Sequence, residues 1–193
     1  MRLDSLTDEV LLVRARGGCE PSFTLLYQRH QGRIYRFSLQ MSGSESIAEE
    51  VTQEVFLALV ADLTRYEASR GMLLPYLMGV ARHQTYRSLR HEQPFLSLEE
   101  GEDSSFEPSV NAHVLEELTG RQTLESLHRA IGSLPPVYRE AIILCDLEEM
   151  DYAQAAQALG CAIGTVRSRL HRGRALLMEK WQAERPAASL RSK

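Results

Sequence analysis

Residues 152–174 read YAQAAQALGCAIGTVRSRLHRGR, and this stretch decides the fold of the C-terminal part of the chain. It contains two short helical patterns separated by Gly160, Cys161 and Ala162. A helix, a tight turn that contains glycine and a second helix form a helix-turn-helix unit. Apolar residues of both patterns recur at helical spacing and can share one core: Ala155, Ala156, Leu159, Val166 and Leu170. The stretch therefore predicts a helix-turn-helix.

The second helix of this unit has a strongly basic outer side, although the formal net charge of the whole chain is −4. The polar side chains left outside the core are Thr165, Arg167, Ser168, Arg169, His171, Arg172 and Arg174. A helix of this width fits the DNA major groove, where arginine pairs with guanine O6 and N7 and with phosphates. A solvated arginine face is the alternative. We favour contact with duplex DNA because the first half of the helix contains no acidic residue.

The rest of the chain is also expected to be helical, since no alternating apolar run of useful length predicts a strand. In the N-terminal half we expect a helix from Thr7 to Gly17 and a second one with Pro21 in its first turn. A third should follow the turn SGSES at 42–46, and a fourth should cover 73–90. A length of 193 residues then suits an all-α fold of two small helical domains.

A change of composition separates these two domains. Residues 92–111 read EQPFLSLEEGEDSSFEPSVN, with two prolines, several serines, many acids and no sustained period, and this is typical of a flexible linker. We therefore expect domains at 8–91 and 112–181, with a disordered tail at 182–193. In the second domain Pro135 and Pro136 should begin a helix, and Asp151 with Gln154 should form a capping box.

Several classes of protein are disfavoured by what the chain lacks. Its first residues, MRLDSLTDEV, are too acidic for a signal peptide, and no apolar run approaches the roughly 18 residues of a membrane span, so a cytoplasmic protein is expected. Cys19, Cys145 and Cys161 are odd in number and far apart, which fits neither a disulfide framework nor a zinc site. We expect no catalytic residue, no metal and no cofactor.

The longer stretch 134–177, LPPVYREAIILCDLEEMDYAQAAQALGCAIGTVRSRLHRGRALL, resembles region 4 of bacterial sigma factors of the extracytoplasmic-function type. The resemblance rests on Leu134-Pro135, Tyr138-Arg139, Tyr152, Gly164-Thr165-Val166 and Ser168-Arg169-Leu170. It implies that the outward residues of the second helix bind the minus-thirty-five promoter element. Ala162, where the family often has a capping serine, and Gly173, where alanine is usual, depart from the pattern.

A second stretch, SIAEEVTQEVFLAL at 46–59, resembles the polymerase-binding helix of sigma region 2. The resemblance implies contact with a basic helical surface on the largest catalytic subunit of core RNA polymerase. The residues that would make it are Glu49, Glu50, Gln53, Glu54 and Phe56. Their spacing permits this contact but is equally compatible with an ordinary solvated helix face.

The helix at 73–91, LLPYLMGVARHQTYRSLRH, resembles the part of region 2 that opens and reads the minus-ten element. The candidate residues for the melted strand are Tyr76, Arg82, His83, Tyr86, Arg87 and Arg90. Arg82, Tyr86 and Arg90 should share one face, and arginines interleaved with aromatic rings suit a separated DNA strand. Tyr76 stands where the family usually has tryptophan, and Arg82-His83-Gln84 also departs from the common wording.

Taken together, the two matches imply a noncatalytic sigma factor that binds core RNA polymerase and directs promoter-specific transcription initiation. Its implied partners are core polymerase, promoter DNA and an anti-sigma protein. A ligand-sensing helix-turn-helix repressor or activator is the main alternative, but it leaves the match at 46–59 unexplained. A carboxylate-bridged metal enzyme would need the Glu-x-x-His motif twice. The chain has it once, at Glu125 to His128.

Overall fold

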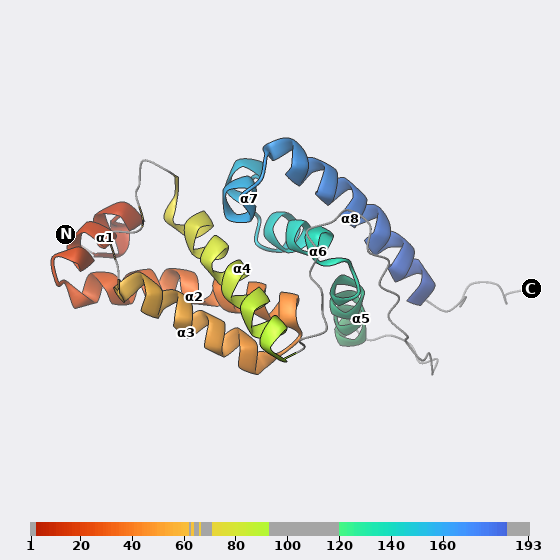
Figure 1. Ribbon diagram of the computed structural model, residues 1–193, viewed down its shortest axis with the longest axis horizontal. Coiled ribbons are helices and arrows are strands. Elements are labelled where there is room, and N and C mark those ends of the chain that lie inside the picture. The colour runs from red at the N-terminus through yellow and green to blue at the C-terminus, as the bar shows by residue number, and fades with distance from the viewer. Residues whose placement is uncertain (1–2, 62, 64–65, 67–70, 93–119, 185–193) are drawn as a thin grey trace, which may run out of the picture.

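The computed structural model describes residues 3–61, 63, 66, 71–92 and 120–184, and these residues form helices joined by turns (Figure 1). No strand occurs in these ranges, so the predicted all-α class is confirmed. None of the helices in the described ranges is long and apolar enough to cross a membrane.

The N-terminal half consists of η1 (Leu3–Ser5), α1 (Asp8–Arg16), α2 (Glu20–Ser42), α3 (Glu45–Ala61) and α4 (Leu73–Glu92). Thr7 occupies the N-cap of α1 as expected, but its hydroxyl makes no capping bond and donates to Glu9 instead. Helix α2 ends at Gly43, whose φ of 70° lies in the left-handed region that glycine adopts without strain. This helix is central because it packs against α1, α3 and α4, with Leu26, Ile34 and Phe37 fully buried.

The C-terminal half consists of α5 (Gly120–Gly132), α6 (Pro136–Ile142), the π-helical turn η3 (Ile143–Leu147), α7 (Tyr152–Leu159) and α8 (Ile163–Glu184). Pro135 and Pro136 begin α6 as predicted. The expected linker lies outside the described residues except for Glu92, which is the last residue of α4. The tail predicted at 182–193 is wrong for 182–184, which continue α8, and the remainder lies outside the described residues.

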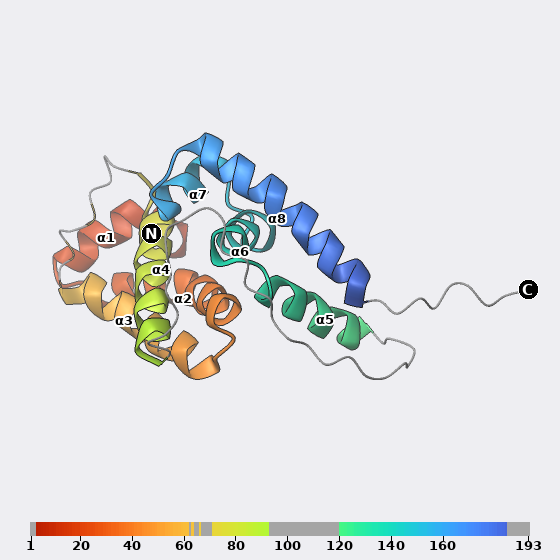
Figure 2. The same ribbon diagram turned by 45° about the vertical axis from the view of Figure 1, so that its right-hand side comes forward.

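The two halves pack against each other through α4 with α7 and through α2 with α5, α6 and η3 (Figure 1, Figure 2). Buried apolar residues from both halves form one continuous cluster that runs from Leu11 to Leu170. Helix α8 lies on the far side of α6 from the N-terminal helices in both views. The sequence analysis predicted two domains but did not predict this contact between them.

Candidate nucleic-acid and polymerase interface

The helix-turn-helix is formed by α7 and α8 as the sequence predicts. The Asp151 carboxylate accepts the amide of Gln154 at 2.8 Å, and the Gln154 side chain accepts the amide of Asp151, which completes the capping box. Gly160 ends α7 with a φ of 64°. Val166 and Leu170 of α8 are buried, so the register of α8 is set by its apolar side.

The opposite side of α8 is open to solvent, as required for a helix that enters a DNA groove. Among the predicted DNA-binding residues, Arg167, Ser168, His171, Arg172 and Arg174 are exposed, while Thr165 and Arg169 are half-buried. The Arg167 guanidinium lies over the Tyr152 ring, with Cζ 5.6 Å from the ring centroid. The preceding Ala162 supplies only its carbonyl to cap the helix, accepting the amides of Thr165 and Val166.

Arg174 differs from the rest of this set because it is already paired. Its Nη2 lies 2.6 Å from Asp146 Oδ1, and its Nε donates to Oδ2 at 3.1 Å. Hydrogen bonding to Asp146, with its negative charge, raises the pKa of Arg174. A phosphate at this position would compete with that carboxylate.

Helix α3 presents an acidic surface, which we call the α3 acidic face: Glu49, Glu50, Gln53 and Glu54 are all exposed. Phe56 does not belong to it. Its side chain is 4% exposed and packs against Phe23 and Tyr27, with ring centroids 6.4 and 4.7 Å away. The prediction that Phe56 lies on a partner-binding surface is therefore wrong, because the residue is part of the core.

Two apolar residues that the sequence analysis missed continue the α3 acidic face. Leu57 is 61% exposed and lies one helical turn beyond Gln53 and Glu54, and Val60 is 51% exposed and lies one turn beyond Leu57. Their helical spacing from Gln53 and Glu54 was the signal in the sequence that they lie on the same side of the helix. Composition could not reveal it, because leucine and valine in an apolar helix are usually buried.

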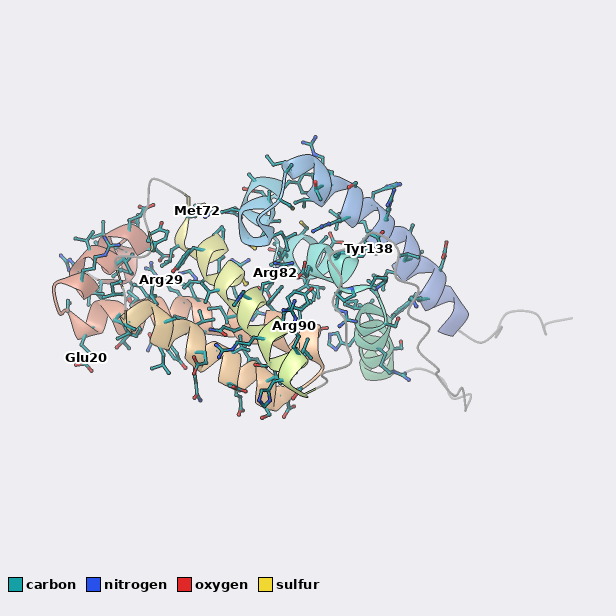
Figure 3. All side chains as sticks on the ribbon, viewed as in Figure 1. Glu20, Arg29, Met72, Arg82, Arg90 and Tyr138 are labelled. Carbon is teal, nitrogen blue, oxygen red and sulfur yellow. The ribbon has the colours of Figure 1, made fainter. Side chains whose placement is uncertain are left out.

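The six candidates on α4 do not share one open face. Arg82 and Tyr86 lie toward the C-terminal half (Figure 3 labels Arg82 between α4 and α6), whereas His83, Arg87 and Arg90 are exposed. The Arg82 Nε donates to Glu140 Oε1 at 2.6 Å, and its Cζ lies 5.2 Å from the Tyr86 ring centroid. Burial, followed by the neighbouring Glu140 carboxylate, raises the pKa of Tyr86. The face predicted for Arg82, Tyr86 and Arg90 is therefore partly covered: Arg82 and Tyr86 are half-buried, whereas Arg90 is exposed.

Tyr76, the remaining candidate on α4, packs inside the N-terminal half. Its ring centroid lies 5.7 Å from that of Tyr66. The Tyr66 hydroxyl in turn donates to the carbonyl of Gly71 at 2.8 Å. Tyr76 is only half-buried, so one side of its ring stays accessible at the start of α4.

A further charged cluster was not predicted at all. Arg33 and Arg36 of α2 both donate to the carboxylate of Glu148, at 2.9 Å from Arg33 Nε and 2.8 Å from Arg36 Nε. Arg33 also donates to the Glu148 carbonyl. The side chain of Glu148 is only 2% exposed. Within the described ranges, no group of histidine, cysteine or acidic side chains could hold a metal ion.

Two family models match this chain, one in each half. Residues 26–95 match the family model described as sigma-70 region 2, and residues 124–177 match sigma-70, region 4. The first match covers most of α2 and all of α3 and α4, and the second covers α7 and α8 as far as residue 177.

Curated relatives are similar over most of the chain. The ECF RNA polymerase sigma factor SigC of Mycobacterium tuberculosis is 31% identical over 148 residues, which is 77% of each chain. SigE of Mycolicibacterium smegmatis is 30% identical over 159 residues, covering 82% of this chain and 61% of that relative. The sigma-E factor of Escherichia coli is 28% identical over 93% of this chain and 96% of its own length.

Solved structures share the fold. CnrH in complex with the cytosolic domain of CnrY superposes with a TM-score of 0.71 and 21% identity, covering 92% of this chain and 99% of that chain. The sigma factor RpoE in complex with the anti-sigma factor NepR from Bartonella quintana gives a TM-score of 0.61 and 27% identity, over 80% and 93% of the two chains.

Proposed function

The chain belongs to the extracytoplasmic-function group of the sigma-70 family of RNA polymerase sigma factors. We propose that the exposed surfaces of α8, α4 and α3 have separate roles in promoter recognition. Helix α8 binds the upstream promoter element as duplex, α4 binds the melted strand, and α3 docks on core polymerase. The domains follow as region 2 at 8–91 and region 4 at 112–181.

Binding of the upstream element by α8 is supported by the exposure of Arg167, His171 and Arg172, with Arg169 half-buried beside them. Arg167 and Arg169 lie in the first half of the helix, where the recognition helix of a helix-turn-helix meets base edges. Arg174 lies further along and is held by Asp146, so it suits a phosphate contact at the edge of the interface.

Docking of α3 on polymerase is supported by the α3 acidic face and its apolar extension. Exposed carboxylates suit a basic partner surface, and the flanking Leu57 and Val60 can be buried by that partner. Without Phe56, the proposed contact set is Glu49, Glu50, Gln53 and Glu54, with Leu57 and Val60 added.

Binding of the melted strand by α4 is supported by His83, Arg87 and Arg90, which are exposed in the observed arrangement of the two halves. Arg82 and Tyr86 can join them only when the C-terminal half moves away, since Arg82 is bonded to Glu140. The accessible side of the Tyr76 ring can receive a base at the start of the helix.

RNA synthesis belongs to the polymerase in this proposal, and the chain catalyses no reaction of its own. It acts in the cytoplasm, where core polymerase is found. The complex of RpoE with the anti-sigma factor NepR, at 27% identity, supports an anti-sigma protein as a further partner.

The observation that carries the proposal is that a helix with an exposed acidic face and a helix-turn-helix with exposed arginines occur in one chain that matches both sigma-70 regions. The test is in vitro transcription with purified core polymerase on fragmented genomic DNA, with sequencing of the RNA ends. Defined start sites should appear only when the protein is added. Replacing Arg167 and Arg169 with alanine should abolish them, while Arg129→Ala, an exposed arginine of α5, should not. DNA binding without any core-dependent start site would instead favour a repressor or activator.

A further inference from the structure

Tyr152 is the first residue of α7, and its backbone is held firmly in place. Asp151 caps the helix just before it and forms the capping box with Gln154. Ala155 and Ala156, one turn further on, are buried in the core that α7 shares with α8. Both ends of this turn are therefore fixed, and Tyr152 lies between them. Figure 1 shows α7 and the start of α8 next to each other, and the two helices are in contact.

The ring of Tyr152 restrains an arginine of the second helix of the unit. The Cζ of Arg167 lies 5.6 Å from the ring centroid. A guanidinium is attracted to the face of an aromatic ring within about 6 Å of its centroid. Arg167 is exposed and Tyr152 is 39% exposed, so both side chains can be reached by a partner. In the part of the chain that the structure describes, no hydrogen bond or ion pair holds Arg167, so its restraint there comes from the ring.

Arg174, two turns further along α8, is restrained in a different way. Its Nη2 and Nε both bond the carboxylate of Asp146. That carboxylate occupies donors of the guanidinium and offsets its charge. A tyrosine ring attracts the cation through its face, takes up none of the N–H donors and carries no charge. Arg167 therefore keeps all its donors and its full charge for DNA, although its position is limited.

The orientation of an arginine matters more for a base contact than for a phosphate contact. Two parallel hydrogen bonds to guanine O6 and N7 require one orientation of the planar guanidinium. Phosphate contacts carry no sequence information directly. A free arginine side chain loses rotamer freedom when it binds, and a side chain that is already restrained loses less. The Tyr152 ring therefore favours base recognition by Arg167.

We propose that Tyr152 is a positioning residue for sequence recognition: its ring holds the Arg167 guanidinium ready for one base pair of the upstream duplex. Tyr152 acts through Arg167 and reads no base itself. The specificity of α8 then depends on a residue of the preceding helix. The inference rests on the proposed binding of the upstream element by α8.

The size of the effect follows from the strength of the ring contact. An exposed cation–π contact changes an equilibrium by about two- to fivefold, so loss of the ring should lower the preference at one base position by about that factor. Preferences at the other positions should stay the same, because other side chains read them. A purely structural change in α7 would instead weaken binding to all sequences alike.

The test uses the full chain and a library of random-sequence DNA 20-mers in duplex form. Bound duplexes are sequenced, and the frequency of each base relative to the input library gives the preference at each position. Fluorescence anisotropy at several salt concentrations then measures affinity for the selected duplex and its single-base variants. The variants are Arg167→Ala, Tyr152→Leu, Tyr152→Phe and the double variant Arg167→Ala with Tyr152→Leu. Tyr35→Leu is the matched control, because it makes the same change at a half-buried tyrosine of α2.

Arg167→Ala should abolish the preference at one position of the site that the wild type selects. Tyr152→Leu should lower the preference at that same position about two- to fivefold, with an unchanged dependence of affinity on salt because no charge is lost. Tyr152→Phe should keep the preference since the ring remains, and Tyr35→Leu should keep it too. The double variant should match Arg167→Ala, because a residue that acts only through Arg167 has no effect once that arginine is absent.

Three results would overturn the inference. One is an unchanged base preference in Tyr152→Leu or in Arg167→Ala. Another is a Tyr152→Leu protein that binds all duplexes equally more weakly. The third is a further loss of preference in the double variant, which would make Tyr152 a DNA contact in its own right. Each would leave the proposed function intact as long as the wild type directs core-dependent start sites. A failure of the proposed function would appear as no start sites with core polymerase, whatever sequence the library experiment selects.

Discussion

The thiol of Cys19 lies at the N-cap of α2 and accepts a hydrogen bond from the Ser22 hydroxyl at 3.2 Å, which lowers its pKa. Burial, helped by the charge of Asp146, raises the pKa of Cys145 to about 11. Since the thiolate is the reactive form, Cys19 should be alkylated by iodoacetamide at pH 8 much faster than Cys145. Peptide mass spectrometry over time measures both rates, and Ser22→Ala should slow Cys19 selectively. Equal rates at the two thiols would contradict the assignment.

Gly173 shows how a residue that weakens a helix can be required by packing. Glycine costs about 1 kcal/mol of helix propensity relative to alanine. A Cβ at Gly173 would, however, lie 3.2 Å from Ile142 Cγ1 and 3.3 Å from Tyr138 Cβ, so the glycine lets α8 approach α6. This contact explains a departure from the family pattern that the sequence alone leaves unexplained.

We therefore expect Gly173→Val to lower the free energy of unfolding by about 1–3 kcal/mol through overpacking. Gly164→Ala is the control, because nothing lies within 4 Å of a Cβ there, and it should raise stability by up to about 1 kcal/mol. Urea denaturation followed by circular dichroism measures both. A valine variant as stable as the wild type would show that the approach of α8 to α6 is not limited by this residue.

At the scale of elements, the α3 acidic face gives the clearest prediction. Glu50→Lys combined with Glu54→Lys should weaken binding to core polymerase by at least about tenfold, because like charges would then face the basic partner surface. Both residues are exposed, so stability should change by no more than about 0.5 kcal/mol. Pull-down with purified core polymerase measures the affinity. The control is Glu9→Lys with Glu20→Lys, exposed acids on α1 and α2. If both double variants lost the same affinity for core polymerase, the cause would be the change in net charge and not the α3 acidic face.

The elements themselves were largely predictable because their signals are local. Asp151 and Gln154 are three residues apart, and the spacing of Ala155, Val166 and Leu170 reports the shared core of α7 and α8 directly. The site was harder to predict. Phe56 follows an acidic run and is nevertheless turned into the core by its register on α3. Helical spacing gives a residue's side of a helix but does not tell what covers that side.

At the scale of the whole molecule, prediction failed for a physical reason. Arg82 and Glu140 are 58 residues apart, and Arg33 and Glu148 are 115 apart. Residues so far apart are not related by any helical spacing, so the sequence does not show that they pair. Taken alone, each one resembles an ordinary charged surface residue. These pairs also explain why Arg82, an open DNA contact in the sequence analysis, is bonded to Glu140 in the structure.

The contact between the two halves should couple their unfolding, since their buried residues form one cluster. Trp181 is the single tryptophan and lies on α8, so its fluorescence reports the C-terminal half, whereas far-ultraviolet circular dichroism reports helices of both. In urea the two signals should give coincident transitions for the wild type. In Glu148→Gln the bonds from Arg33 and Arg36 are weakened, and the transitions should separate.

Asp8→Asn distinguishes loss of coupling from a simple loss of stability. This change removes contacts inside the N-terminal half without weakening any bond between halves. Because the halves stay coupled, both signals should move to a lower urea midpoint and remain coincident. In Glu148→Gln the two midpoints should instead separate, because each half loses the support of the other. If the two signals of Glu148→Gln still coincide at the wild-type midpoint, the Glu148 cluster does not join the halves in solution.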